Sequence, residues 1–187
     1  MRKNDVSIVI PALNEPYLPK LLQKLNVYDV HVQSEKGLVH AVWKGIKTSK
    51  SNIVVIMDAD GSHPPEAIPR MISMLNSKTW FIIGSRYCKG GYSGDSIPRK
   101  IVSMIYCLIT RIILLTRIND PMSGFWVGYR ERFVFEPNGN YKFGLQLIRK
   151  YKNHIKEYPI IFKKRVEGKS KVKPIQALKD LFSIFRG

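Results

Sequence analysis

The sequence contains few acidic residues and few cysteines. Aspartate and glutamate number 14 of 187 residues, against 31 lysine and arginine residues, which gives a formal net charge of +17. Such a surface attracts polyanions: nucleic acid, anionic lipid headgroups or phosphorylated substrates. The two cysteines, Cys88 and Cys107, lack the spacing of a metal site. We expect both to be reduced thiols in a cytoplasmic protein.

The sequence also lacks a hydrophobic run long enough to cross a bilayer. Its most apolar stretch, Ile97–Ile118, is interrupted by Arg111, whereas a spanning helix needs about 20 apolar residues. We therefore expect either a buried core helix or a helix in the membrane interface, with its basic residues reaching headgroups. The apolar run near the N-terminus is too short for a signal peptide.

Strand patterns and helix patterns alternate along the first half of the chain. Runs of β-branched and other apolar residues predict four strands, at Val6–Ile10, Val30–Val32, Ile53–Met57 and Trp80–Ile83. Apolar residues at helical spacing predict three helices between them, at Tyr17–Leu25, Leu38–Ile46 and Pro65–Leu75. This alternation predicts an α/β fold with a mostly parallel sheet and helices on both faces. No Gly-x-Gly-x-x-Gly follows the first strand, which disfavours a dinucleotide oxidoreductase.

The second half of the chain is less regular. We expect a long helix at Ile97–Ile118, a turn at Asp120–Phe125 and a strand at Phe125–Tyr129. A helix at Phe143–Tyr151 and a further strand at Tyr158–Phe162 follow. A basic loop at Lys163–Lys173 then precedes an apolar helical stripe. We therefore divide the chain into one domain, residues 1–173, and an amphipathic helix, residues 174–187, that is a candidate for the membrane interface.

An acidic motif, Asp58-Ala59-Asp60, directly follows the predicted strand at Ile53–Met57. Side chains at positions i and i+2 of an extended segment project to the same side, so the two carboxylates can share one Mg²⁺ or Mn²⁺ ion. Ser62 and His63 lie close enough in the sequence to assist. The alternative is a polar turn in which an aspartate caps the helix that follows.

Basic residues gather where a phosphate could be held. Arg86 follows a predicted strand, and Arg99 and Ser103 share one face of the long helix. Arg165 and Lys171 lie in the basic loop. The forked donors of arginine suit phosphate oxygens. The alternatives are solvated surface charges and electrostatic attraction to nucleic acid.

Six segments stand in an order that is typical of one family. They are Ser7–Glu15, Gly37–Gly45, Val55–Glu66, Ile83–Tyr87, Asp120–Phe125 and Arg165–Lys171. In this order they resemble the family 2 glycosyltransferases, and within them the dolichyl-phosphate mannose synthases. The resemblance implies a Rossmann-like glycosyltransferase A-type fold and an inverting transfer of a hexose, mannose or glucose. The donor would be a GDP- or UDP-hexose, and the acceptor would be a polyprenyl (dolichyl) phosphate. The reaction would take place at the cytoplasmic face of a membrane.

The resemblance also implies a cofactor and roles for individual residues. The cofactor would be Mg²⁺ or Mn²⁺, held by Asp58, Asp60 and Ser62. The nucleotide sugar would be bound by Pro11, Ala12, Asn14, Glu15, Asp58 and Arg165. The acceptor phosphate would be bound by Arg86, Arg99 and Ser103, with Lys171 as a further candidate from the basic loop. Catalytic roles would fall to Asp60, Asp120 and Arg86.

The sequence departs from this family in two places. Family members carry a strand ending in an Asp-Asp-Gly-Ser type motif where Tyr17–Lys36 has no acidic pair. Family members often have a glutamate where this chain has Gln146, which cannot act as a general base. A phosphate acceptor needs no such base, because its second pKa is about 6 and it is already charged near neutral pH.

Two alternative functions remain open from the sequence. The missing acidic pair motivates a degenerate, non-catalytic relative that binds a lipid or a protein. The net charge motivates a nucleic-acid-binding module, although that hypothesis leaves the acidic motif and the apolar helix unexplained, and the sequence contains no known nucleic-acid motif.

Overall fold

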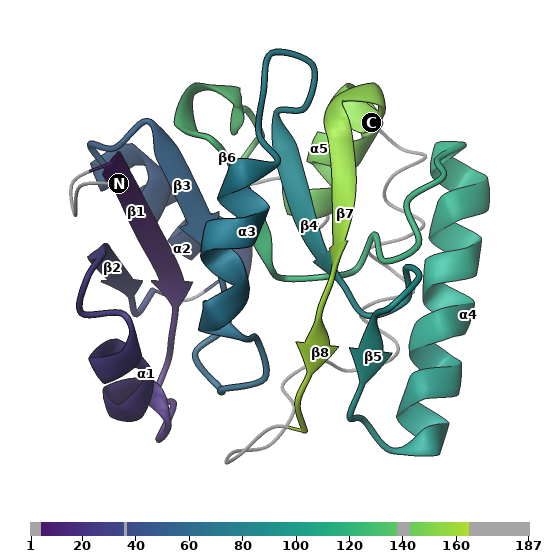
Figure 1. Ribbon diagram of the computed structural model, residues 1–187, viewed down its shortest axis with the longest axis horizontal. Coiled ribbons are helices and arrows are strands. Elements are labelled where there is room, and N and C mark those ends of the chain that lie inside the picture. Colours follow the sequence, from purple (N-terminus) through teal and green to yellow (C-terminus); the bar gives the residue numbers. More distant parts are fainter. Residues whose placement is uncertain (1–4, 36, 138–142, 165–187) are drawn as a thin grey trace.

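The fold is built on one six-stranded sheet with the order β2-β1-β3-β6-β4-β7. The computed structural model describes residues 5–35, 37–137 and 143–164 (Figure 1). The six strands are β1 (Val6–Pro11), β2 (Asp29–Gln33), β3 (Ile53–Ile56), β4 (Phe81–Ser85), β6 (Trp126–Tyr129) and β7 (Ile155–Pro159). β6 runs antiparallel to its neighbours β3 and β4, whereas the other pairings in the sheet are parallel. The predicted, mostly parallel sheet is therefore confirmed.

Helices cover both faces of the sheet, as predicted. α1 (Leu18–Lys24) and α3 (Ile68–Ser73) pack on one face, and α2 (Leu38–Thr48) and α5 (Phe143–Tyr151) pack on the other. Successive side chains of a strand point to opposite faces. In β1, accordingly, Ile8 and Ile10 join the core under α1 and α3, while Val9 joins the core under α2.

The chain after α5 departs from the prediction of a single strand at Tyr158–Phe162. β7 begins three residues earlier than predicted, because its polar residues Lys156 and Glu157 sit on a sheet edge and hide the apolar pattern. After Pro159 the chain leaves the main sheet as β8 (Ile161–Phe162), which pairs with β5 (Tyr92–Ser93) in a small second sheet. β5 was not predicted, since two residues carry no periodic signal.

Two predicted helices are shorter in the structure. The helix predicted at Pro65–Leu75 is a 3-10 turn, η2 (Pro65–Ala67), followed by α3, because Pro69 begins a new helix. The long helix α4 (Ile97–Leu114) ends four residues early, at Leu115, which adopts a left-handed backbone. Two further 3-10 turns, η3 (Arg130–Arg132) and η4 (Lys152–His154), complete the elements of the described chain.

The sequence left two alternatives for the long helix, a buried core helix or a helix in the membrane interface. In the structure α4 is not a buried core helix. Its buried residues are Cys107, Thr110 and Leu114, and it lies along one side of the molecule (Figure 1). Nine large apolar residues from the helix and its end are exposed: Ile97, Ile101, Val102, Met104, Ile105, Leu108, Ile109, Ile112 and Leu115. Nevertheless, no helix in the described part of the chain is long and apolar enough to cross a membrane.

Candidate active site

The acidic motif forms the turn that follows β3. Asp60 is 4% exposed, and its Oδ1 accepts hydrogen bonds from the backbone N–H of Ser62 at 3.0 Å and from the Ser62 hydroxyl at 2.5 Å. The side chain of Asp58 is 42% exposed. One carboxylate is thus held inside the turn, while the other reaches the surface of the molecule.

His63 lies buried beneath this turn. Its Nδ1 accepts a hydrogen bond from the backbone N–H of Asp58 at 3.0 Å, and its ring is 2% exposed. Burial lowers the pKa of His63. The charges of Asp58, Asp60 and Asp120 oppose that shift and the charge of Arg86 adds to it. Charged groups from the acidic turn, from the end of β4 and from the turn at Asp120 therefore all influence this buried ring.

The turn after β1 packs against the acidic turn. Asn14 adopts a left-handed backbone with φ of 54°, a conformation that asparagine tolerates better than most residues. The ring of Tyr17 lies on Gly61 so closely that a Cβ there would come within 2.6 Å of Tyr17 Cε1. Any side chain at position 61 would therefore push the two turns apart.

The carboxyl end of β2 borders the same turn. The backbone N–H of Ala12 donates to the carbonyl of Gln33 at 2.9 Å, where Pro11 pairs with Gln33 in the sheet. Glu15 follows and is half-buried. The predicted nucleotide-sugar residues at positions 11–15 thus form one turn beside the acidic motif. Arg165, also predicted for that site, lies outside the described residues.

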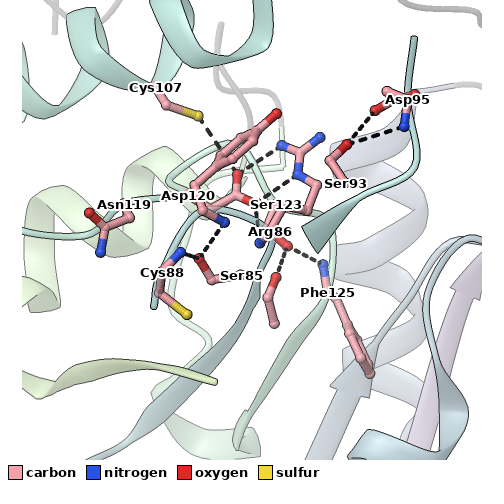
Figure 2. Close-up of polar contacts among 12 residues, drawn as sticks. Ser85, Arg86, Cys88, Ser93, Asp95, Cys107, Asn119, Asp120, Ser123 and Phe125 are labelled. Carbon is pink, nitrogen blue, oxygen red and sulfur yellow. Dashed lines mark hydrogen bonds and ion pairs between the residues drawn. The ribbon is translucent and has the colours of Figure 1, made fainter. Parts of the chain in front are cut away.

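Arg86 and Asp120 form a buried ion pair at the end of β4 (Figure 2). The Arg86 guanidinium donates from Nε to Asp120 Oδ2 at 2.7 Å and from the second terminal nitrogen to Oδ1 at 2.8 Å. The backbone N–H of Arg86 donates to Oδ2 at 2.9 Å. Asp120 is fully buried, so it is placed to orient Arg86 rather than to accept a proton from solvent. Burial acts to lower the pKa of Arg86, but the hydrogen bonds and charge of Asp120 outweigh it and raise that pKa.

A glutamate that the sequence analysis did not single out supports this pair. Glu157 in β7 accepts hydrogen bonds from the backbone N–H of Asn119 and of Asp120, both at 2.9 Å, and from the Asn119 side chain at 2.8 Å. The Ser123 hydroxyl donates to the carbonyl of Gly84 at 2.6 Å and so ties the turn to β4 (Figure 2). The sequence does contain a signal for Glu157, since an acidic residue within a strand is unusual in a chain with so few acidic residues.

α4 reaches the ion pair through a cysteine. The Cys107 thiol lies 3.7 Å from Asp120 Oδ1, and burial followed by the charge of Asp120 raises the pKa of Cys107 to about 12 (Figure 2). Burial raises the pKa of the Tyr87 hydroxyl, and Ser103, one turn before Cys107 in α4, acts to lower it. That hydroxyl makes no hydrogen bond within the described part of the chain. Ser103 is therefore near the Arg86 end of the site.

Arg99, one of the predicted acceptor-phosphate residues, is not part of this buried group. Arg99 is 55% exposed at the start of α4 and pairs with Asp95 at 3.7 Å. Asp95 in turn is hydrogen-bonded to Ser93 (Figure 2). Lys171 lies outside the described residues, as do the predicted terminal helix at 174–187 and the boundary at residue 173.

The acidic turn fits a divalent cation in its chemistry. Two carboxylates in one turn supply the oxygen ligands that Mg²⁺ and Mn²⁺ prefer. Gly124 leaves room beside one of them, because a Cβ at that position would lie 3.2 Å from Asp58 Oδ2. Within residues 5–35, 37–137 and 143–164, no cluster of three or more His, Cys, Asp or Glu side chains forms a metal site. Among the described residues, these two carboxylates are candidates to hold a cation, with further oxygens from a bound ligand.

Comparison with known proteins defines the class. Residues 21–135 match the model of glycosyl transferase family 2, so the chain belongs to that family. The chain is 35% identical over 175 residues to a dolichol-phosphate mannosyltransferase of Pyrococcus furiosus, and 33% identical over 180 residues to one of Saccharomyces cerevisiae. These alignments cover 89% and 86% of this chain but 49% and 66% of those relatives. The chain thus spans about half of the length of the first relative and about two thirds of the length of the second.

Solved structures confirm the fold. Glucosyl-3-phosphoglycerate synthase from Mycobacterium tuberculosis, in complex with Mn²⁺ and UDP-glucose, superposes with a TM-score of 0.67 at 15% identity, over 98% of this chain and 78% of that one. Mannosyl-3-phosphoglycerate synthase from Rubrobacter xylanophilus gives a TM-score of 0.62 at 14% identity, over 97% and 71%. The predicted glycosyltransferase A-type fold is therefore confirmed. A nucleic-acid-binding module finds no support among these relatives.

Proposed function

We propose that this chain transfers a hexose, mannose or glucose, from a nucleotide diphosphate sugar to a polyprenyl phosphate, with inversion at the anomeric carbon. One observation carries the proposal. The acidic turn and the Arg86–Asp120 pair come from different parts of the chain, yet both adjoin one aromatic ring. The Phe162 ring centroid lies 5.3 Å from the Arg86 guanidinium carbon and 5.4 Å from the ring centroid of His63, whose Nδ1 accepts a hydrogen bond from the Asp58 backbone N–H. A cation-bound diphosphate held by the acidic turn would therefore lie near an arginine that could face a second phosphate. The names of the relatives support the choice of donor and acceptor.

The donor side consists of the turns after β1 and β3. Asp58 and Asp60 would hold Mg²⁺ or Mn²⁺, while Ser62 keeps Asp60 oriented through its two hydrogen bonds. When bound there, the ion would bind the donor diphosphate and offset the charge that grows on the leaving nucleotide. The turn at residues 11–15 would bind the nucleotide together with Arg165. In the sequence, Arg165 comes two residues after Lys163, whose backbone N–H donates to the carbonyl of Ser62.

The acceptor side consists of Arg86 with residues of α4. Arg86 is fixed by Asp120, and its guanidinium carbon lies 4.9 Å from the Tyr87 ring centroid and 5.3 Å from that of Phe162. A rigidly held guanidinium loses little entropy when it binds a phosphate. Ser103, Arg99 and Lys171 are the further candidates for that phosphate.

The reaction needs no general base in this arrangement. An oxygen of the acceptor phosphate forms a bond to the anomeric carbon, while the bond from that carbon to the donor diphosphate breaks and its electron pair leaves with the nucleotide. The acceptor is already charged near neutral pH, since its second pKa is about 6. Gln146 fits this scheme, because its side chain is bonded to the backbone of Glu136 rather than serving as a base. What the site must supply is alignment of two anions.

The exposed side of α4 would place this reaction at a lipid surface. Its apolar residues could enter the membrane interface while nearby arginines reach anionic headgroups. A polyprenyl phosphate carries its phosphate at that same interface. We accordingly propose that the chain works as a peripheral protein on the cytoplasmic face of a membrane.

Transfer assays with an isosteric variant test the proposal. Vesicles containing a polyprenyl phosphate would be incubated with Mn²⁺ and labelled GDP-mannose or UDP-glucose, and the labelled polyprenyl phosphosugar measured. Asp60→Asn keeps an oxygen that can accept both Ser62 hydrogen bonds but removes the charge. We expect it to fold normally and to lose about 10²-fold or more in transfer rate.

The same assay distinguishes the proposed enzyme from the remaining alternative, a non-catalytic relative. β2 pairs directly with β1 and ends in Gln33, with no acidic pair at its carboxyl end, which is the observation that favours a non-catalytic relative. Absence of transfer from every nucleotide sugar, together with retained vesicle binding, would favour that relative. Full turnover by Asp60→Asn would refute the metal assignment.

A further inference from the structure

We propose that His63 is a positioning residue, which uses one ring to fix both the backbone and the carboxylate of Asp58 for cation binding. This inference rests on the proposed function and deepens it. His63 itself would not be a ligand, since it is 2% exposed and its Nδ1 is occupied by a hydrogen bond.

The hydrogen bond defines the state of the ring. Nδ1 of His63 accepts from the backbone N–H of Asp58 at 3.0 Å. A protonated imidazole has no acceptor nitrogen, so the ring is neutral and its proton lies on Nε2. Nε2 is 3.9 Å from Asp58 Oδ2, too long for a hydrogen bond but close enough for the N–H dipole to attract the carboxylate.

Packing fixes the orientation of the ring. Phe125 stacks on His63 at 5.0 Å between ring centroids and an interplanar angle of 17°, and Phe162 meets it edge-on at 5.4 Å and 65°. The backbone N–H of Lys163 donates to the carbonyl of Ser62 at 3.0 Å, which holds the Phe162 segment against the acidic turn. The ring therefore cannot rotate without disturbing two segments of the chain.

This arrangement resembles the support that outer residues give to metal ligands elsewhere. Groups that orient a ligand without touching the metal commonly contribute about 10- to 100-fold in metal affinity. Here the oriented group is Asp58, the more exposed of the two carboxylates, with 42% of its side chain exposed. Without His63, nothing described in the structure would hold the Asp58 backbone N–H, and the carboxylate would be free to sample other directions.

Two substitutions separate positioning from simple packing. His63→Leu fills the space between two phenylalanine rings with an apolar side chain but removes the acceptor. His63→Asn supplies an oxygen near the position of Nδ1 that can accept from the Asp58 backbone. Mn²⁺ affinity would be measured by electron paramagnetic resonance titration in the presence of GDP-mannose or UDP-glucose, and thermal unfolding would be measured without metal.

We expect His63→Leu to weaken Mn²⁺ binding by about tenfold or more. The unfolding temperature without metal should fall only modestly, because one hydrogen bond to the Asp58 backbone is lost while the apolar packing is kept. His63→Asn should lose clearly less affinity than His63→Leu, because it restores the hydrogen bond to the Asp58 backbone but not the Nε2 contact with the Asp58 carboxylate. Wild-type affinity in His63→Leu would overturn the inference and leave the proposed function standing. Equal losses of affinity and stability in both variants would assign His63 a packing role only. Failure of the wild type to bind Mn²⁺ with any nucleotide sugar would remove the proposed function, and the inference with it.

Discussion

At the scale of single residues, Asp120 carries a charge that the fold cannot leave unpaired. It is fully buried and receives three hydrogen bonds from Arg86, which is 12% exposed. Removing one partner of such a pair leaves an uncompensated buried charge, which typically costs about 3–5 kcal/mol. We therefore expect Asp120→Asn to lower the free energy of unfolding by several kcal/mol, as measured by urea denaturation, and to weaken binding of the acceptor phosphate.

Asp95→Asn is the matched control for this variant. Asp95 also pairs with an arginine, but Arg99 is 55% exposed and the two atoms are 3.7 Å apart. Asp95 itself is 16% exposed, but its partner guanidinium is solvated, and such a pair contributes roughly 0–1 kcal/mol, so this variant should unfold almost like the wild type. Similar denaturation midpoints for the two variants would contradict the tight burial of the Arg86–Asp120 pair.

The site residues that the sequence identified share a simple property. Asp58, Asp60 and Arg86 lie within three residues of the ends of predicted strands, and the ends of parallel strands meet at one edge of a sheet. Glu157 was missed because it acts through the backbone N–H groups of residues 119 and 120, a contact that no spacing in the sequence encodes. His63 was recognised as close to the motif, but its hydrogen bond to Asp58 appears only in the folded turn.

At the scale of elements, the end of α4 is strained by a leucine. Leu115 adopts a left-handed backbone with φ of 48° and ψ of 51°, and it is 80% exposed. That conformation costs a residue with a Cβ roughly 1–2 kcal/mol, whereas glycine adopts it readily. Since little buried surface would be lost, we expect Leu115→Gly to leave stability unchanged or raise it by up to about 1 kcal/mol, measured by thermal unfolding.

Leu108→Gly makes the same substitution in the middle of the helix. Leu108 is 55% exposed, so this change also loses little burial. Glycine in a helix interior costs about 1 kcal/mol, so this variant should be less stable than the wild type. A loss of stability at Leu115 as large as that at Leu108 would show that the left-handed end of α4 is not formed in solution.

Element prediction succeeded where burial is regular. The central strands β1 and β3 are almost wholly apolar and were recognised, and α5 begins and ends at the predicted residues. β7 lies at a sheet edge and mixes Lys156 and Glu157 with apolar residues, so its start was missed. The direction of β6 was not predictable either, because its pairing with β3 and β4 depends on the path of the chain around α4.

At the scale of the whole molecule, one side combines apolar surface with a strongly basic chain. Large exposed apolar patches on soluble proteins commonly mark interaction sites, and α4 exposes large apolar residues along most of its length. The formal net charge of +17 attracts the chain to anionic lipid. The two forces differ in their response to salt, because only the electrostatic attraction is screened.

Paired substitutions can separate these two forces on vesicles of phosphatidylcholine and phosphatidylserine. Leu108→Glu with Ile112→Glu changes two neighbouring residues of the α4 stripe, which are 55% and 64% exposed. Val27→Glu with Val134→Glu adds the same charge outside α4, at exposed apolar positions whose exposed fractions are 59% and 52%.

Burial of a leucine or isoleucine contributes about 1.5–3 kcal/mol, so the α4 pair should weaken vesicle binding at least about tenfold, also at high salt. The control pair should stay within about threefold. Equal weakening by both pairs would mean that charge alone holds the protein on lipid, and unchanged binding of the α4 pair would exclude α4 as the docking surface.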